Sequence, residues 1–118
     1  MKPWLFERAT ESVALATVAT IALFTPAHAG DVGKGRQIAA VKCQMCHGLD
    51  GLAKLPQAPN LAGQTEQYIV TQMAAFRDKT RQNDMMSLVV PTLSDDDVAD
   101  LAAYYAAIEV KIVKVPGE

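Results

Sequence analysis

Residues 43–47 have the sequence Cys-Gln-Met-Cys-His, a C-x-x-C-H pentapeptide. This spacing is typical of the attachment site of a c-type haem. The two thiols add to the two vinyl groups of the porphyrin, and the histidine that follows becomes the proximal ligand of the iron. Cys43 and Cys46 are the only cysteines of the chain. The motif therefore predicts one haem c, bound covalently through Cys43 and Cys46 and ligated by His47.

Two other kinds of site use a C-x-x-C pair. A thiol redox motif of the thioredoxin type needs a βαβ context, and the residues that flank Cys43 are not rich in β-formers. A zinc site needs four ligands, but the only histidine besides His47 is His28. His28 lies in a segment that we expect to be removed. Both alternatives are therefore much weaker than haem.

The start of the chain is typical of an export signal. A basic beginning precedes an uncharged run over Val13–Phe24, and Ala27 and Ala29 are small residues at the two positions that determine cleavage. The uncharged run is shorter than the roughly 20 residues that span a bilayer. We therefore expect a cleavable signal peptide over 1–29, a mature domain over 30–118 and a periplasmic protein. A buried core helix or an uncleaved membrane anchor is the alternative interpretation.

Composition limits the classes of function. The chain has 11 Lys and Arg residues against 13 Asp and Glu residues, a net charge of −2, and no basic tract. Nucleic-acid binding therefore has no support. After the N-terminal run there is no second long apolar stretch, so the mature domain is not expected to span a membrane. A chain this short buries only a modest core, and a haem would add apolar surface to pack around.

The elements that must position the motif are predicted to be helices and one long loop. A helix over about Val32–Lys42 runs directly into the haem motif. Gly48–Gly63 contains several glycines and prolines and shows no periodicity, so it is predicted to be a loop. A loop of this length in a small domain should have a purpose, and wrapping a cofactor would be one.

Two further helices and a short turn are predicted after the loop. Thr65–Lys79 has apolar residues at helical spacing and a threonine suited to the N-cap. Met85–Val90 is expected to form a short helical turn that ends at the following proline. Ser94 should cap a final helix that reaches about Ile108, and 109–118 should form a loosely ordered tail. The expected core around the haem consists of Ile38, Tyr68, Met73, Phe76, Val98, Leu101 and Tyr105.

In this order the elements resemble a class I c-type cytochrome, within the small mono-haem bacterial group similar to c-four-type and c-five-type domains. Ala58–Gln64 resembles the P-x-L-A-G-Q stretch of that group, Asn83–Met86 resembles its methionine-bearing loop, and Leu93–Tyr105 resembles its L-S-D-x-D…A-x-Y-Y helix. A proline often found between Asp and Met in the loop is absent. The resemblance covers almost all of 30–108. It implies an all-α, small cytochrome c fold with about four helices wrapped around one covalently bound haem.

The resemblance also implies how the proximal side is completed. The carbonyl of Pro59 is expected to accept a hydrogen bond from the second ring nitrogen of His47, which would fix the tautomer and tune the basicity of the ligand. Leu61 is expected to pack on the face of the haem. The first and last helices should cross, with small residues of the first meeting Tyr104 or Tyr105.

A methionine is expected as the sixth ligand, because a thioether raises the potential and suits an electron carrier. Met45 lies within the attachment loop and cannot reach the far side. Met73 lies on the apolar face of a helix and is expected in the core. The family's spacing to the helix-capping serine fits Met86, and Met85 is the second choice. Arg77 and Arg81 are expected to be solvated, with a haem propionate as their alternative partner.

These residues predict a periplasmic electron carrier rather than an enzyme. With His47 and Met86 in both axial positions, the iron has no open site for substrate. Its partners would be redox proteins that dock transiently, such as a dehydrogenase, an oxidase or another cytochrome. One alternative is a tightly bound cytochrome subunit of a larger periplasmic or membrane redox enzyme. A haem enzyme or gas sensor is a weaker one, because it needs a vacant sixth site.

Overall fold

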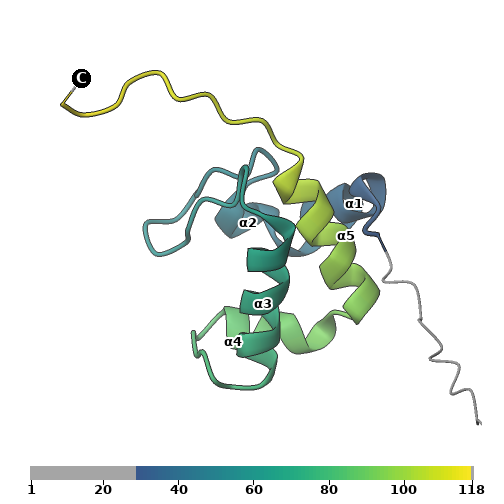
Figure 1. Cartoon of the computed structure of the whole chain (residues 1–118). Coiled ribbons are helices and arrows are strands. Elements are labelled where there is room, and N and C mark those ends of the chain that lie inside the picture. The colour runs from purple at the N-terminus through teal and green to yellow at the C-terminus, as the bar shows by residue number, and fades with distance from the viewer. Residues whose placement is uncertain (1–28, 118) are drawn as a thin grey trace, which may run out of the picture.

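The structure is a computed structural model that describes residues 29–117, so nearly all of the expected signal peptide, with His28, lies outside the described residues. All regular elements within this range are helical, which confirms the all-α prediction (Figure 1). No helix in it is long and apolar enough to cross a membrane. The elements are α1 (Val32–Lys42), α2 (Gln44–His47), α3 (Glu66–Arg77), α4 (Met86–Val89), the 3₁₀ turn η1 (Val90–Thr92) and α5 (Asp95–Ala106).

Helices α1 and α5 cross at a glycine (Figure 1). A Cβ added to Gly35 would lie 2.8 Å from Cβ of Tyr104 and would overlap the carbonyl of Asp100. Glycine near the start of a helix weakens its propensity, but here it allows the two backbones to approach. The family resemblance implied this crossing, with the contact at small residues such as Ala39 or Ala40, and Ala39 is indeed fully buried.

Helices α3 and α5 begin with the caps that the sequence predicts, and α1 begins with a cap, Asp31, that was not predicted. The hydroxyl of Thr65 accepts a hydrogen bond from the backbone N–H of Tyr68, at 3.3 Å. Ser94 and Asp97 form a reciprocal capping box at the start of α5, with bonds of 3.0 and 2.9 Å. The backbone N–H of Ser94 holds the pKa of the Asp97 carboxyl below its usual range.

The core lies between α3, α5 and η1. Most of the expected core residues are buried, but Ile38 is only partly buried and Tyr68 is 47% exposed. The prediction for Tyr68 was wrong because the inward face of α3 is centred on Ile69, Met73 and Phe76, so that Tyr68 lies on its flank. The buried cluster comprises Ala39, Ile69, Met73, Phe76, Val90, Leu93, Val98, Leu101, Ala102, Tyr104 and Tyr105.

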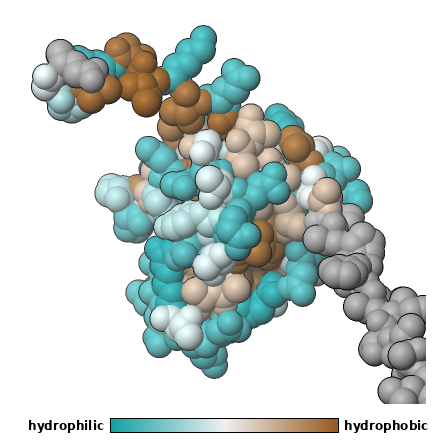
Figure 2. Space-filling model, viewed as in Figure 1, coloured by the Kyte–Doolittle hydropathy of each residue, from teal (hydrophilic) through white to brown (hydrophobic). Residues whose placement is uncertain are grey.

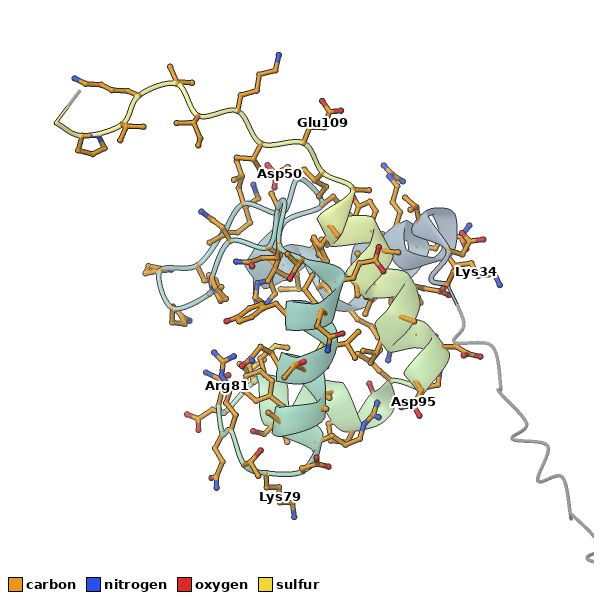
Figure 3. All side chains as sticks on the ribbon, in the orientation of Figure 1. Lys34, Asp50, Lys79, Arg81, Asp95 and Glu109 are labelled. Carbon is orange, nitrogen blue, oxygen red and sulfur yellow. The ribbon has the colours of Figure 1, made fainter. Side chains whose placement is uncertain are left out.

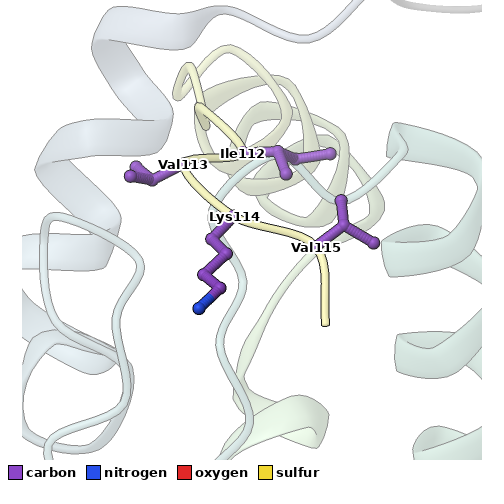
Figure 4. Close-up of a pocket in the computed structure, with 4 residues that line it drawn as sticks. All are labelled: Ile112, Val113, Lys114 and Val115. Atoms are coloured by element: carbon purple, nitrogen blue, oxygen red, sulfur yellow. The ribbon is translucent and has the colours of Figure 1, made fainter. Parts of the chain in front are cut away.

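After α5 the chain leaves the body of the domain as an extended segment without helix or strand (Figure 1). Its apolar side chains project from the surface (Figure 2). They border a shallow hollow of about 340 Å³ lined by Ile112, Val113, Lys114 and Val115 (Figure 4). Only residues of this tail line the hollow, so the haem motif is not part of it. Loose order in this tail stays a prediction.

Candidate haem-binding site

The C-x-x-C-H motif forms a helical turn of its own. Cys43 ends α1 and begins α2, and the backbone N–H of His47 donates to the carbonyl of Cys43 at 2.9 Å. Residues three apart on a helical turn lie on one side, so the turn directs Cys43 and Cys46 toward the same side. Both thiols are free and partly buried. The sequence did not predict α2 as a helix, because one turn is too short to show periodicity.

His47 is held by its ring. The side chain is only 7% exposed, and its Nδ1 lies 2.9 Å from the carbonyl oxygen of Pro59. A carbonyl only accepts, so this contact places the proton on Nδ1 and leaves Nε2 with the lone pair that a metal requires. The structure therefore brings together the two residues that were predicted to pair. Ligation of iron by His47 stays a prediction.

The loop that carries Pro59 is folded back on the motif. The backbone N–H of Leu61 donates to the carbonyl of Gly51 at 2.7 Å, and the side chain of Asn60 accepts from the backbone of Ala53, also at 2.7 Å. Leu61 is partly buried and packs against the core. Its predicted contact with the face of the haem is consistent with this position and stays a prediction.

The chain turns sharply at Gly48, directly after His47. Gly48 has φ 70° and ψ 155°, a conformation that is essentially restricted to glycine. A Cβ there would also lie 2.6 Å from Cε of Lys54 and 2.7 Å from the carbonyl of Leu52. The sequence indicated a loop at this glycine, and the structure shows that the loop depends on it.

Two tyrosines of α5 reach the same segment. The hydroxyl of Tyr104 donates to the carbonyl of Leu49 at 2.6 Å, and that of Tyr105 donates to the carbonyl of Gly48 at 3.2 Å. Burial raises the pKa of the Cys43 thiol to about 11, and a hydrogen bond with Tyr105 opposes part of that shift. Burial also raises the pKa of Tyr105. The sequence placed Tyr105 in the core and the resemblance placed Tyr104 or Tyr105 at the helix crossing, but both missed the bonds of the hydroxyls, although a buried Tyr usually needs a polar partner.

The four methionines of the described chain differ in their surroundings. Met86 begins α4 and packs, partly buried, against the core, whereas Met85 is 56% exposed. The side chain of Asn83 accepts from the backbone N–H groups of both, each at 3.0 Å. Met73 is buried between α3 and α5, and Met45 is exposed. These positions are consistent with Met86 as the predicted ligand and with Met73 as a core residue.

The two arginines near the end of α3 already have protein partners. Arg77 forms an ion pair with Asp95, with Nη1 and Oδ1 at 2.5 Å. The guanidinium of Arg81 lies over the ring of Phe76, 4.7 Å from its centroid, and the side chain lies away from α5 (Figure 3). Arg77 therefore ties α3 to α5 rather than standing free in solvent, and Arg81 lies on the surface of α3.

The donor set fits a haem and does not fit a bare metal ion. Within residues 29–117 no three His, Cys, Asp or Glu side chains are grouped to hold a metal. Two free thiols on one side of a turn, followed by a buried imidazole with one nitrogen already bound, are what covalent attachment and axial ligation require. Cys43, Cys46 and His47 would hold the group on one side, and Met86 would close the other.

The family model for cytochrome c matches residues 32–107. The chain belongs to the cytochrome c family. Family membership and the C-x-x-C-H spacing of Cys43, Cys46 and His47 together establish one covalently bound haem c. The relation to the c-four group that the sequence motifs indicated is confirmed by the relatives described next.

Several relatives show which parts of the family this cytochrome domain resembles. It is 43% identical over 94 residues to cytochrome c4 of Pseudomonas aeruginosa, an alignment that covers 79% of this chain and 46% of that protein. It is 40% identical over 84 residues to cytochrome c-554(548) of Halomonas halodenitrificans, covering 69% of this chain and 100% of that protein. The chain thus spans about half the length of the c4 relatives it matches.

A solved structure of thiosulfate dehydrogenase from Marichromatium purpuratum has the same fold over this region. The TM-score is 0.61 at 32% sequence identity, and the match covers 66% of this chain and 19% of that one. The family therefore includes the fold both as a whole short cytochrome and as a part of a much longer chain.

Proposed function

We propose that this cytochrome is a one-electron carrier whose haem is closed on one side by His47 and on the other by Met86. When bound, the haem supplies a one-electron couple at its iron. The observation that carries the proposal is the 2.9 Å contact between Nδ1 of His47 and the carbonyl of Pro59. It fixes one imidazole nitrogen and directs the other away as a ligand. A residue held in this way changes little between oxidation states, and that suits electron transfer.

The other residues of the chain hold this arrangement in place. Cys43 and Cys46 tether the group to the turn α2, Leu61 packs against its face, and Met86 supplies a thioether that favours the reduced state. The crossed helices α1 and α5 keep the tether and the loop in register. Docking of redox partners such as a dehydrogenase, an oxidase or another cytochrome would be transient, with small interfaces.

The test is to remove each of the two adjacent methionines in the haem-loaded protein. The unmodified protein should show the absorption band that reports ligation of iron(III) by methionine, and it should not bind carbon monoxide readily. Met86→Ala should lose the band, lower the midpoint potential and bind carbon monoxide. Met85→Ala is the matched control and should keep the band.

The outcomes separate the competing ideas. If Met85→Ala loses the band while Met86→Ala keeps it, Met85 is the ligand and the carrier still stands. If the unmodified protein lacks the band and binds carbon monoxide, the carrier proposal fails and a haem enzyme or gas sensor replaces it.

A bound subunit of a larger redox enzyme is the second candidate. The likeness to thiosulfate dehydrogenase favours it, whereas the complete match to cytochrome c-554(548) favours a free carrier. Native purification from the source organism distinguishes them. Stable co-elution with one partner would support the subunit, and a lone monomer would support the carrier.

We also propose that the protein is exported and processed after Ala29. Small residues at Ala27 and Ala29 support this site. N-terminal sequencing of the protein from the periplasmic fraction should begin at Gly30. An intact N-terminus in the membrane fraction would instead indicate an uncleaved anchor.

A further inference from the structure

We propose that Tyr104 and Tyr105 are positioning residues that set the orientation of His47 through the backbone of Gly48 and Leu49. This inference rests on the proposed function, in which His47 is an axial ligand. The two hydroxyls come from α5 and cross 55 and 57 residues of sequence to reach the two carbonyls that follow the histidine. The most distant part of the fold therefore holds the segment next to the ligand.

The two hydroxyls reach neighbouring carbonyls although they belong to adjacent residues of one helix. Consecutive residues of an α-helix point about 100° apart, so adjacent side chains rarely serve one target. Here the rings of Tyr104 and Tyr105 lie with centroids 5.1 Å apart and planes tilted by 57°. Both hydroxyls nevertheless reach neighbouring carbonyls, because the last turns of α5 approach the segment after α2 closely.

The loop over residues 48–63 is bound at both ends by Tyr105. The hydroxyl of Tyr105 holds its first residue at Gly48, and the backbone carbonyl of Tyr105 accepts from the N–H of its last residue, Gly63, at 3.0 Å. One residue thus closes both ends of the loop. The loop carries Pro59, whose carbonyl binds the ring of His47. Tyr105 therefore acts on His47 in two ways: it binds the residue that follows the histidine, and it closes the loop that carries the acceptor of the imidazole.

The two tyrosines differ in their burial and in how close their acceptors lie to His47 along the chain. Tyr105 is 1% exposed, and its acceptor belongs to the residue directly after His47. Tyr104 is 9% exposed, and its acceptor lies one residue further away. Removal of the Tyr105 hydroxyl leaves the buried carbonyl of Gly48 with the N–H of Gly51, at 3.3 Å, as its donor, and the lost bond is not readily replaced by water there. Water replaces a lost donor more readily near the surface. Tyr105 should therefore matter more than Tyr104, although its bond is the longer one.

The experiment compares three variants of the full, haem-loaded protein: Tyr105→Phe, Tyr104→Phe and Ser94→Ala. Phenylalanine keeps the ring and removes only the hydroxyl. Ser94→Ala is the control because it removes the N-cap of the same helix, where the side chain of Ser94 bonds Asp97 and not residues 43–49. The readouts are the proton NMR shifts of the haem methyl groups in the oxidised state, which report the plane of the axial histidine, and the midpoint potential.

We expect a changed pattern of methyl shifts and a shifted potential in Tyr105→Phe, and a smaller change of the same kind in Tyr104→Phe. Ser94→Ala should lower the thermal midpoint and leave both readouts unchanged. The inference is overturned if the Phe variants lose stability like Ser94→Ala but keep the methyl pattern and potential of the unmodified protein. If Tyr105→Phe does not fold, Tyr104→Phe decides by the same criterion. Absence of methionine ligation in the unmodified protein would refute the carrier, yet the methyl patterns would still test the tyrosines.

Discussion

The segment that carries His47 and the segment that carries Met86 are held in different ways. The proximal side is bound to distant parts of the chain, because His47 contacts a loop residue 12 positions away and the two carbonyls after it are bound from α5. The methionine segment has local hydrogen bonds. The side chain of Asn83 accepts from the backbone N–H groups of Met85 and Met86, and Asn83 and Ser87 bond each other. Long-range contacts form and break with the whole domain, whereas local ones open alone.

This difference predicts two ligands of unequal stability. The imidazole should stay in place for as long as the domain is folded. The thioether should be the ligand that is lost first under mild stress. The distal segment should open without unfolding the whole core, because its hydrogen bonds are local, although the side chain of Met86 packs against that core.

Substitution of Gly48 should cause the largest loss of stability. Gly48→Ala should lower the free energy of unfolding by about 3 kcal/mol, because an alanine there adopts a strained conformation and its Cβ meets Lys54 and Leu52. Thermal unfolding of the haem-loaded protein measures this loss. Gly33→Ala is the control, since that glycine is helical and exposed and meets only Asp31 at 3.2 Å. Equal midpoints for the two variants would show that the turn after the ligand is not needed.

Opening of the distal segment should require less free energy than global unfolding, by about 2 kcal/mol. A urea titration followed by the methionine–iron(III) band and by far-ultraviolet circular dichroism measures both events. The band should disappear at the lower urea concentration. Coincident transitions would mean that Met86 is held as firmly as His47, and the contrast between the two sides would not stand.

Lys79 lies between α3 and the segment that carries Met86, and like Gly48 it has a positive φ. It lies two residues after the end of α3, with φ 62°, in the left-handed region that disfavours residues other than glycine. Lys79→Gly should raise the free energy of unfolding by about 0.5 kcal/mol, since relief of strain exceeds the extra entropy of glycine in the unfolded chain. Chemical denaturation measures the change. A loss of stability would instead show that the lysine side chain contributes a contact.

The smallest expected effect is a loss of stability at low pH in the turn beside Gly48. Lys54 and the backbone N–H of Leu52 hold the pKa of the Asp50 carboxyl below its usual range. A lowered pKa in the folded state adds stability that is present above the ordinary value of about 3.9 and is lost as pH falls through the lowered value. The difference in unfolding free energy between the unmodified protein and Asp50→Asn should therefore be constant above about pH 5 and shrink below it. A difference that does not change with pH would show that this pair does not support the turn.

The sequence was most informative where structure depends on near neighbours. Helices α1, α3 and α5 and the caps Thr65 and Ser94 follow from periodicity and from hydrogen bonds over three or four residues. The haem motif is likewise local. The pairing of His47 with Pro59 came from the family resemblance and not from the residues alone, because it depends on how a loop folds back.

The features that the sequence missed depend on contacts between residues that are far apart along the chain. The role of Gly35 at the crossing was not predicted, because it exists only once α5 lies against it. Tyr68 was placed in the core because periodicity gives a face but not its centre. The targets of the Tyr104 and Tyr105 hydroxyls could not be found without the crossing of α1 and α5, which brings the two ends of the domain together.

Closure of the loop by Tyr105 also gives the chain an order of maturation. The pentapeptide that receives haem is complete once Cys43–His47 has been made, but the contacts that hold its histidine need a residue 57 positions beyond Gly48. Those contacts cannot form before that residue has been made. Under the proposed role of Tyr105, a chain that ends before α5 would carry the attachment chemistry without a defined ligand geometry. One orientation of the histidine would then depend on synthesis and folding of the last helix.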